Sequence, residues 1–252
     1  MTRERVDLPI AALAGAVARE KLGELHLVLQ PEPIWLPEEA RGEAESAVDE
    51  ALAEAGLVDG RGRVDVEFLD WLPLLTNASL EYYGWFTADG TTWGVLTAAR
   101  GVQGLLAVRR ADWVTLVPIG RNRLAESLVE QLPELVPGGG TPWSVRVADL
   151  EAAGRAGTHD RALPVDVREV VKVVQRPVSG SGELYAAERD ERGRCLRLRR
   201  PLHYVDTDWG RYLNYTHGTG DDEEIHIAPG SPGAIVAALE RLRSDLVSAH
   251  SS

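Results

Sequence analysis

The sequence has almost no cysteine, and this excludes two common kinds of site. Cys195 is the one cysteine among 252 residues, so the chain can form no internal disulfide and no cysteine-based zinc site. This composition suits a reducing cytoplasm, which is the predicted location. The six histidines form no H-x-x-x-H or H-E-x-x-H pair, and no phosphate-binding glycine loop is present. We therefore expect no metal and no cofactor.

Positive charge is also scarce. Lys21 and Lys172 are the only lysines, and the formal net charge is -12. Nucleic-acid binding needs a concentrated basic surface. The arginines within residues 188–200 are diluted by acidic residues, which favours a solvated strand face. We expect no nucleic-acid partner.

Long hydrophobic runs are absent, so no stretch is predicted to cross a membrane. The apolar residues 8–18 resemble part of a signal peptide, but Glu4 and Asp7 dilute the positive charge before them. Asp7 is a suitable helix cap, and Pro9 is tolerated in a first turn. We therefore expect a helix over residues 8–22 in a cytoplasmic protein with no membrane partner.

Helical and strand patterns alternate along the first half. Alanines, valine and leucine recur at helical spacing over residues 37–56, and a short helix containing Phe68 is predicted to end at Pro73. Residues 79–118 contain β-rich runs separated by tight turns, which predicts antiparallel strands. A helix is expected at about 122–132.

The second half repeats this layout. Helices are expected at 147–156 and 164–174, then strands, with residues 194–206 as one long or bent strand, and a final helix at 232–247. Both halves end with strands, a proline-terminated strand (Pro118 and Pro229) and an amphipathic helix. We interpret this as an internal duplication within one domain, residues 1–252, whose halves are about 1–136 and 141–252. The predicted class is α+β, with helices packed on a joint antiparallel sheet.

Asp206 and Asp208, in the stretch YVDTDWGRYLNY, are the most conspicuous candidate for chemistry. Paired carboxylates can hold a cation or transfer protons. A calcium loop starting at Asp206 needs glycine at its sixth position and glutamate at its twelfth, where this chain has Arg211 and His217. The pattern favours a strand bend at Gly210.

A small hydrolase is the enzyme alternative, using either this aspartate pair or Ser231. The stretch PGSPG around Ser231 lacks the first glycine of a nucleophile elbow, so helix capping by Ser231 is favoured. The hydrolase hypothesis requires these side chains to converge with a histidine.

Trp85 and Trp93 flank the turn TADGTT, residues 87–92. Apolar residues lie on both faces of this predicted hairpin, so both faces must be covered. A helix of the same chain or a partner protein would provide such cover.

Ordered motifs along nearly the whole chain resemble those of the EspG family, the cytosolic chaperones of type VII secretion in actinobacteria. They are VDLPIAALAGAV, EAGLVDGRGRVD, LTAARGVQGLLAVRRADWVTLVPI and GSGELYAAERDERGRCLRLRRPLHYVDTDWGRYL. The resemblance implies a pseudo-twofold α+β fold, with a central antiparallel sheet flanked by two helical bundles. It implies a non-enzymatic, monomeric or homodimeric chaperone that binds PE–PPE heterodimers and keeps them soluble for export.

The resemblance also implies a partner-binding surface on the central sheet, a sheet loop and the C-terminal bundle. Carried onto this chain, the candidate contacts are Trp85, Asp89, Gly90, Thr91, Trp93, Ile235, Leu239 and Leu242. Residues 155–180 and the acidic TGDDEEI do not match the family pattern closely. The partner is therefore either a PE–PPE-like substrate or another helical hairpin, and an immunity-like protein that binds a secreted toxin is the alternative.

Overall fold

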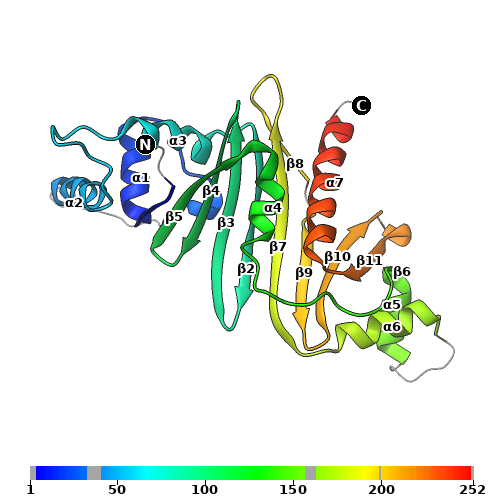
Figure 1. Ribbon diagram of the computed structural model, residues 1–252. Coiled ribbons are helices and arrows are strands. Elements are labelled where there is room, and N and C mark those ends of the chain that lie inside the picture. Colours follow the sequence, from blue (N-terminus) through cyan, green and yellow to red (C-terminus); the bar gives the residue numbers. More distant parts are fainter. Residues whose placement is uncertain (1–3, 33–40, 157–162, 199, 219, 251–252) are drawn as a thin grey trace.

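The computed structural model describes residues 4–32, 41–156, 163–198, 200–218 and 220–250. They form the expected α+β fold, built on one antiparallel sheet with the strand order β1-β5-β4-β3-β2-β7-β9-β10-β11-β6 (Figure 1). Strand β8 is not part of this order and pairs with β7 alone. Strands β2 and β7 lie at the centre, and β1 and β6 form the two edges.

The first half starts with an edge strand and a group of helices, followed by a four-stranded meander and a helix. Its elements are β1 (Val6–Pro9), α1 (Ile10–Arg19), η1 (Leu27–Leu29), α2 (Arg41–Glu54), α3 (Val66–Thr76), β2 (Leu80–Ala88), β3 (Thr91–Arg100), β4 (Gln103–Arg110), β5 (Trp113–Gly120), η3 (Arg121–Arg123) and α4 (Leu124–Val129). Strand β1 returns to pair with β5.

The second half follows the same order. Its elements are β6 (Trp143–Arg146), α5 (Val147–Ala156), α6 (Val165–Val174), β7 (Val178–Arg189), β8 (Cys195–Arg197), β9 (Leu202–Thr207), β10 (Gly210–His217), η4 (Gly220–Asp222), β11 (Glu224–Pro229) and α7 (Pro232–His250). Strand β6 pairs with β11, as β1 pairs with β5. The pseudo-twofold arrangement expected from the sequence is therefore present, with its centre between β2 and β7.

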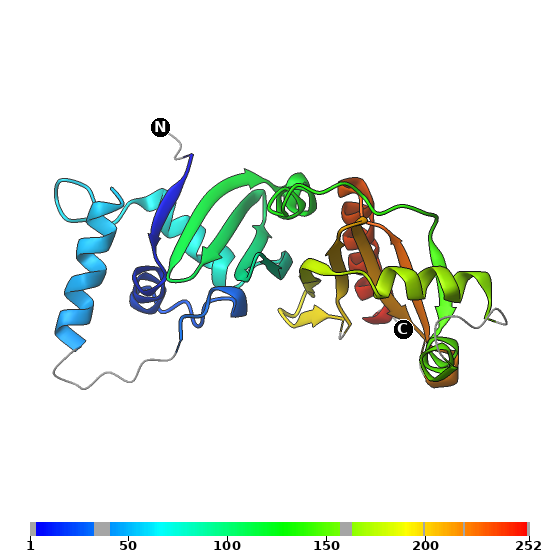
Figure 2. The ribbon, with the colours of Figure 1, turned by 90° about the horizontal axis from the view of Figure 1, so that it is seen from below.

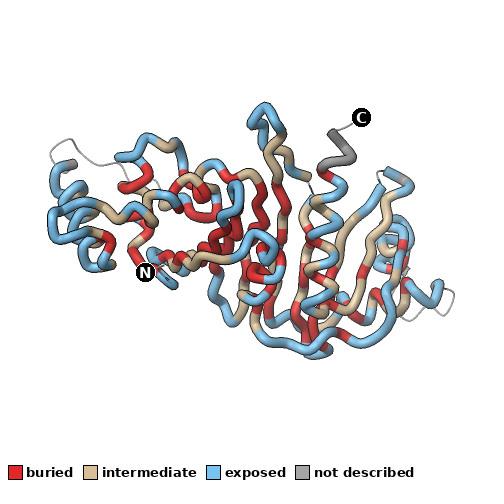
Figure 3. The backbone as a smooth tube through the Cα atoms, turned by 45° about the horizontal axis from the view of Figure 1, so that its top comes forward, coloured by how far each residue is buried: buried red, intermediate tan, exposed pale blue. Residues whose placement is uncertain are grey.

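The helices cover the two sheet faces differently. Helices α4 and α7 lie together over the middle of one face, where they pack on side chains from both halves. On the opposite face, α1 and α3 cover the first half and α5 and α6 cover the far end of the second. Figure 2 shows these two groups at opposite ends of the molecule, with the central strands between them. In Figure 3 the buried segments concentrate in the central strands.

The N-terminal prediction was wrong about the bounds and the cap of the first helix. Residues 6–9 are the edge strand β1, and the helix is Ile10–Arg19 where 8–22 was expected, with Pro9 at its cap position. Asp7 does not cap the helix, because its carboxylate accepts hydrogen bonds from Arg5 and Thr115. Val6 and Leu8 are buried while Asp7 is exposed, so pairing with β5 satisfies the alternation of a strand.

Proline at position 73 does not end the third helix as predicted. Pro73 lies inside α3, which continues to Thr76. A proline removes one helical hydrogen bond, but the fully buried Leu72, Leu74 and Leu75 hold the last turn in the core. Tertiary packing therefore overrides the local signal.

Helix α2 is described as Arg41–Glu54, and residues 37–40 of its predicted span lie outside the described residues. Two other elements differ from the expected ones. The helix expected at 122–132 is a 3-10 turn followed by the short α4. The strand expected over 194–206 is interrupted, since β8 and β9 pair separately with β7.

Candidate partner-binding face

The middle of the sheet has one face that none of the described helices covers. Strand alternation directs Tyr82, Phe86, Leu184 and Tyr204 toward α4 and α7. The intervening residues point to the opposite face, between the two helical groups. We call this region the open face and define it by Trp85, Thr87, Ser181, Glu183, Tyr185, His203, Val205 and Asn214, none of which is buried.

Strand register places four of these residues in one row. Trp85 on β2 is opposite Glu183 on β7, Glu183 is opposite His203 on β9, and His203 is opposite Asn214 on β10. Directly opposed residues on one face of an antiparallel pair lie in side-chain contact range. This row lines a hollow of about 400 Å³, together with Thr87, Ser181 and Val205.

Aromatic rings form one side of the open face. The rings of Tyr83 and Tyr185 stack with their centroids 5.0 Å apart, and Trp85 meets Tyr185 edge to face at 6.1 Å. His26 packs against Tyr83 at 4.5 Å. Such contacts favour a fixed geometry, so the open face presents a preformed aromatic surface.

A carboxylate lies next to these rings. The Tyr185 hydroxyl donates a hydrogen bond of 2.6 Å to Glu183 Oε2. Burial, with this hydrogen bond to a carboxylate, raises the pKa of Tyr185 to about 12, which keeps the phenol protonated and donating. His203 Nδ1 lies 3.9 Å from Glu183 Oε1, which is too far for a hydrogen bond.

A second ionisable pair lies beneath the aromatic rings. Glu81 Oε2 is 3.6 Å from His26 Nε2, and both side chains are at least nine-tenths buried. Burial raises the pKa of Glu81 to about 7, against the opposing effect of Arg189. Burial, with the positive charges of Arg189 and Arg197, lowers the pKa of His26 to about 4. Both groups are therefore held toward their uncharged forms.

The turn between β2 and β3 places its predicted residues at one end of the sheet. Asp89 and Gly90 have φ angles of +50° and +73°, as a tight Asp-Gly hairpin turn requires. Asp89, Gly90 and Thr91 are exposed. Trp93 instead points to the α4 and α7 side, where it is 5% exposed and contacts Phe86.

The three candidate residues on α7 lie on the same side as Trp93. Ile235 and Leu239 are fully buried in the core beneath the helix, and Leu242 is partly buried at its margin. Direct contact of Ile235 or Leu239 with a partner would require α7 to leave the sheet. These positions hold the helix in place, while Trp85 and the turn at 89–91 remain accessible.

The residues of the hydrolase hypothesis have structural partners. The Asp206 carboxylate bonds to Arg211, and the Asp208 carboxylate bonds to Arg176. Ser231 Oγ accepts a hydrogen bond from the Ala234 amide at 3.2 Å, which is the capping role expected for it. Among the described residues, none of these three side chains has a histidine as its hydrogen-bond or ion-pair partner.

The stretch around Asp206 is a hairpin, which is sharper than the expected bend. Strands β9 and β10 pair antiparallel from Thr207 and Gly210 onward. Gly210 has a φ of +107°, a conformation that side chains disfavour. Trp209 at the turn is stacked under the Arg176 guanidinium. The two aspartates of this motif therefore take part in ion pairs that hold the hairpin, Asp206 with Arg211 and Asp208 with Arg176.

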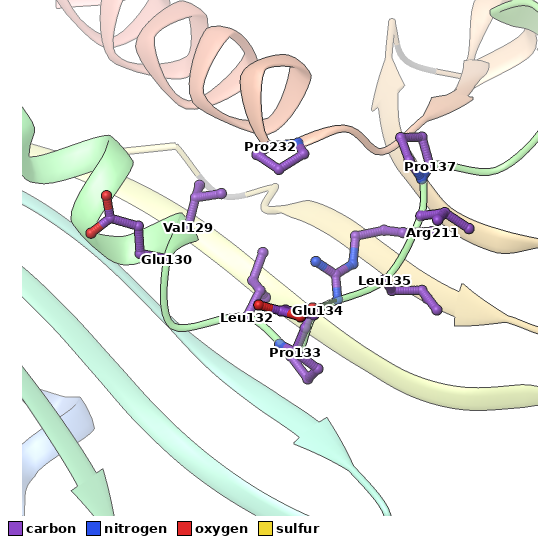
Figure 4. Close-up of a pocket in the computed structure, with 10 residues that line it drawn as sticks. Val129, Glu130, Leu132, Pro133, Glu134, Leu135, Pro137, Arg211 and Pro232 are labelled. Carbon is purple, nitrogen blue, oxygen red and sulfur yellow. Dashed lines mark hydrogen bonds between the residues drawn. The ribbon is translucent and has the colours of Figure 1, made fainter.

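A separate hollow of about 850 Å³ lies between α4, the N-terminus of α7 and residues 133–137 (Figure 4). Leu132, Leu135 and several prolines make its lining largely apolar. None of the eight predicted contact residues lines it.

In the described ranges of the chain, no group of three or more histidine, cysteine, aspartate or glutamate side chains could hold a metal ion. The helices in these same ranges include none with the length and apolar character of a membrane span.

Sequence reasoning did not identify Glu183, Tyr185, His203 or Asn214. Alternation within GELYAAER places Glu183 and Tyr185 on one side of a strand. The register that brings His203 and Asn214 beside them joins distant strands, and no local signal specifies it.

Comparison with known proteins gives a family match and matches among solved structures. A family model described as the EspG family matches residues 9–241. The structure is similar to that of the Mycobacterium tuberculosis type VII secretion system chaperone EspG5, solved in complex with a PE25–PPE41 dimer. The TM-score is 0.72 at 14% sequence identity, and 96% of each chain is covered. At this identity the structural match shows a shared fold. A search of the curated proteins finds no match.

Proposed function

Because this chain belongs to the EspG family, we propose that it is a cytosolic chaperone of type VII secretion. It would bind a PE–PPE-like helical substrate, keep it soluble for export and catalyse no reaction. The family match over residues 9–241 is the observation that carries this proposal. The similar EspG5 structure contains a PE25–PPE41 dimer, which supports the same class of partner.

The open face is the proposed docking surface. It combines aromatic side chains with exposed polar ones, and the turn residues Asp89, Gly90 and Thr91 lie at its end. Aromatic residues are enriched among the residues that dominate binding energy at interfaces. A helical tip laid on this face would be shielded from water, and that would prevent its self-association.

We also propose that the whole chain acts as one domain of two similar halves, 1–136 and 141–252, as a monomer or homodimer. The central β2–β7 pairing supports the single domain, because it joins the halves through nine opposed residue pairs from Leu80↔Glu188 to Ala88↔Gly180. Light scattering of the purified chain would give the oligomeric state.

Co-expression with the helical-hairpin substrates encoded beside this chain, followed by size-exclusion chromatography, tests the function. We expect one substrate to co-elute with the chain and to aggregate without it. The Trp85→Ala variant should lose this complex. Trp113→Ala is the matched control, because Trp113 is 57% exposed on β5 and lies outside the open face.

Two results would contradict the proposal. If every candidate substrate stays soluble without the chain and none binds it, the chaperone function is wrong. If a substrate binds but Trp85→Ala, shown to be folded by circular dichroism, binds as tightly as Trp113→Ala, the function stands and the surface is wrong.

A further inference from the structure

The lining of the open-face hollow carries a negative charge. Glu183 is the one carboxylate in its lining, and the lining contains no lysine or arginine. The Glu183 side chain is 48% exposed, and among the described residues its ion-pair neighbour is His203 at 3.9 Å. The hollow therefore presents a negative charge with no lysine or arginine in its lining, and Arg197 acts electrostatically on the neighbouring Tyr185.

Docking of a partner on this face would change the surroundings of Glu183. A carboxylate that is covered by an apolar surface loses its hydration, and this costs free energy unless a positive charge replaces the water. Tyr185 already donates one hydrogen bond to Oε2, but a neutral donor does not neutralise the charge. A partner that covers the open face must therefore bring a cation to Glu183.

The walls of the hollow suit a cationic side chain. The Trp85 ring lines one side, and an indole is the best aromatic partner for a cation. Ser181, Thr87 and Asn214 also line the hollow, and their side-chain oxygens can accept hydrogen bonds from a guanidinium or ammonium group. Stacking between Tyr83 and Tyr185 holds the Tyr185 ring, and Tyr185 in turn fixes the carboxylate.

We propose that this hollow binds an arginine or lysine side chain from the tip of the helical substrate, with Glu183 as its counter-charge and Trp85 as its aromatic wall. The inference rests on the proposed function for its partner. It makes Glu183 a residue that selects among substrates, because a tip without a suitably placed cation would leave the carboxylate desolvated and unpaired.

Small probes test the hollow without any substrate. The indole N–H signal of Trp85, assigned with Trp85→Phe, is followed by NMR while N-acetyl-arginine amide is added to millimolar concentration. We expect a saturable shift. The neutral isostere N-acetyl-citrulline amide should give none, and Glu183→Gln should abolish the shift, because the amide still accepts from Tyr185 but carries no charge. Glu126→Gln, an exposed residue of α4, is the matched control and should respond like the wild type.

The second arm uses the complex with the co-expressed substrate. Glu183→Gln should weaken binding by about tenfold or more and reduce its salt dependence, and Glu126→Gln should do neither. Replacing one arginine or lysine at the substrate tip should remove the difference between wild type and Glu183→Gln.

Each outcome tests a different part of the proposal. No shift with the arginine probe, or an equal shift with citrulline, overturns the cation site. A probe response combined with unchanged substrate affinity in Glu183→Gln overturns its role in the complex. A wild-type chain that binds no substrate overturns the proposed function and the identity of the partner, while the probe still decides whether the hollow takes a cation.

Discussion

Asp206 and Arg211 face each other across the β9–β10 hairpin and form a buried, two-pronged ion pair. Arg211 Nε lies 2.6 Å from Oδ1 and Nη2 lies 2.7 Å from Oδ2, with both side chains about 5% exposed or less. Nη2 also donates to the Pro133 carbonyl at 2.9 Å, and the guanidinium lies over the Tyr204 ring. The pair thus ties the segment between the two halves to the sheet.

Removing one member of this pair should be costly. Arg211→Met leaves a buried carboxylate without its counter-charge, and we expect the free energy of unfolding to fall by about 3–5 kcal/mol. The double variant Asp206→Asn with Arg211→Met should lose less than Arg211→Met alone. Urea denaturation measures both. Arg176→Met, which breaks the exposed pair with Asp208, is the control and should change stability little. Equal losses in the single and double variants would show that charge burial is not the cause.

The His26–Glu81 pair predicts opposite pH dependences in two single variants. The folded-state pKa of Glu81 is raised from 4.5 to about 7, so its contribution to stability is present below pH 4.5 and is lost as the pH rises through 7. The folded-state pKa of His26 is lowered from 6.5 to about 4, so its contribution is present above pH 6.5 and is lost as the pH falls through 4. In the wild type these effects largely offset each other between pH 4.5 and 6.5.

Each substitution should expose the effect of the other group. In Glu81→Gln, stability should fall by roughly 2–3 kcal/mol as the pH drops from 6.5 to 4. In His26→Gln, it should fall by a similar amount as the pH rises from 4.5 to 7. Urea titrations at a series of pH values, compared with the wild type, measure these slopes. Parallel profiles for the two variants would contradict the assigned pKa directions.

Gly84 permits the close approach of β2 and β7 at the centre of the sheet. A Cβ added there would lie 2.3 Å from the Glu183 carbonyl oxygen, so Gly84→Ala must push the central strands apart. We expect a loss of about 1–3 kcal/mol in thermal or urea unfolding. Gly154→Ala in α5 is the matched control, since no atom lies within 4 Å of its added Cβ, and it should be neutral or stabilising. Similar effects of both substitutions would show that the close approach of β2 and β7 at Gly84 is not the cause of the lost stability.

Helix α7 offers a test that separates core from surface. Leu239→Ala should cost about 2–5 kcal/mol, because Leu239 is fully buried and its truncation leaves a cavity. Leu242→Ala should cost less, because Leu242 is only partly buried. A Leu239→Ala chain that keeps wild-type stability but loses substrate binding would restore Leu239 to the contact surface and imply that α7 moves.

The sequence predicted the repeating parts of the fold well. Alternation in residues 79–118 identified the central meander, and the Asp-Gly turn at 89–90 and the cap at Ser231 follow from local chemistry. It failed at Asp7 and Pro73, where the local signals indicated a helix start and a helix end. In both places, burial of neighbouring side chains against distant strands outweighed a preference of a few kcal/mol or less.

The composition by itself determined that the chain has no internal disulfide and no cysteine-based zinc site, since these depend on which residues exist. Patterning determined the α+β class, because strand and helix periods are local. Only the tertiary structure decided which sheet face lacks helical cover. It also placed Glu183 between Trp85 and His203, which are 98 positions and 20 positions away in the chain. Register and layer order arise from packing between distant segments, and no local pattern encodes them.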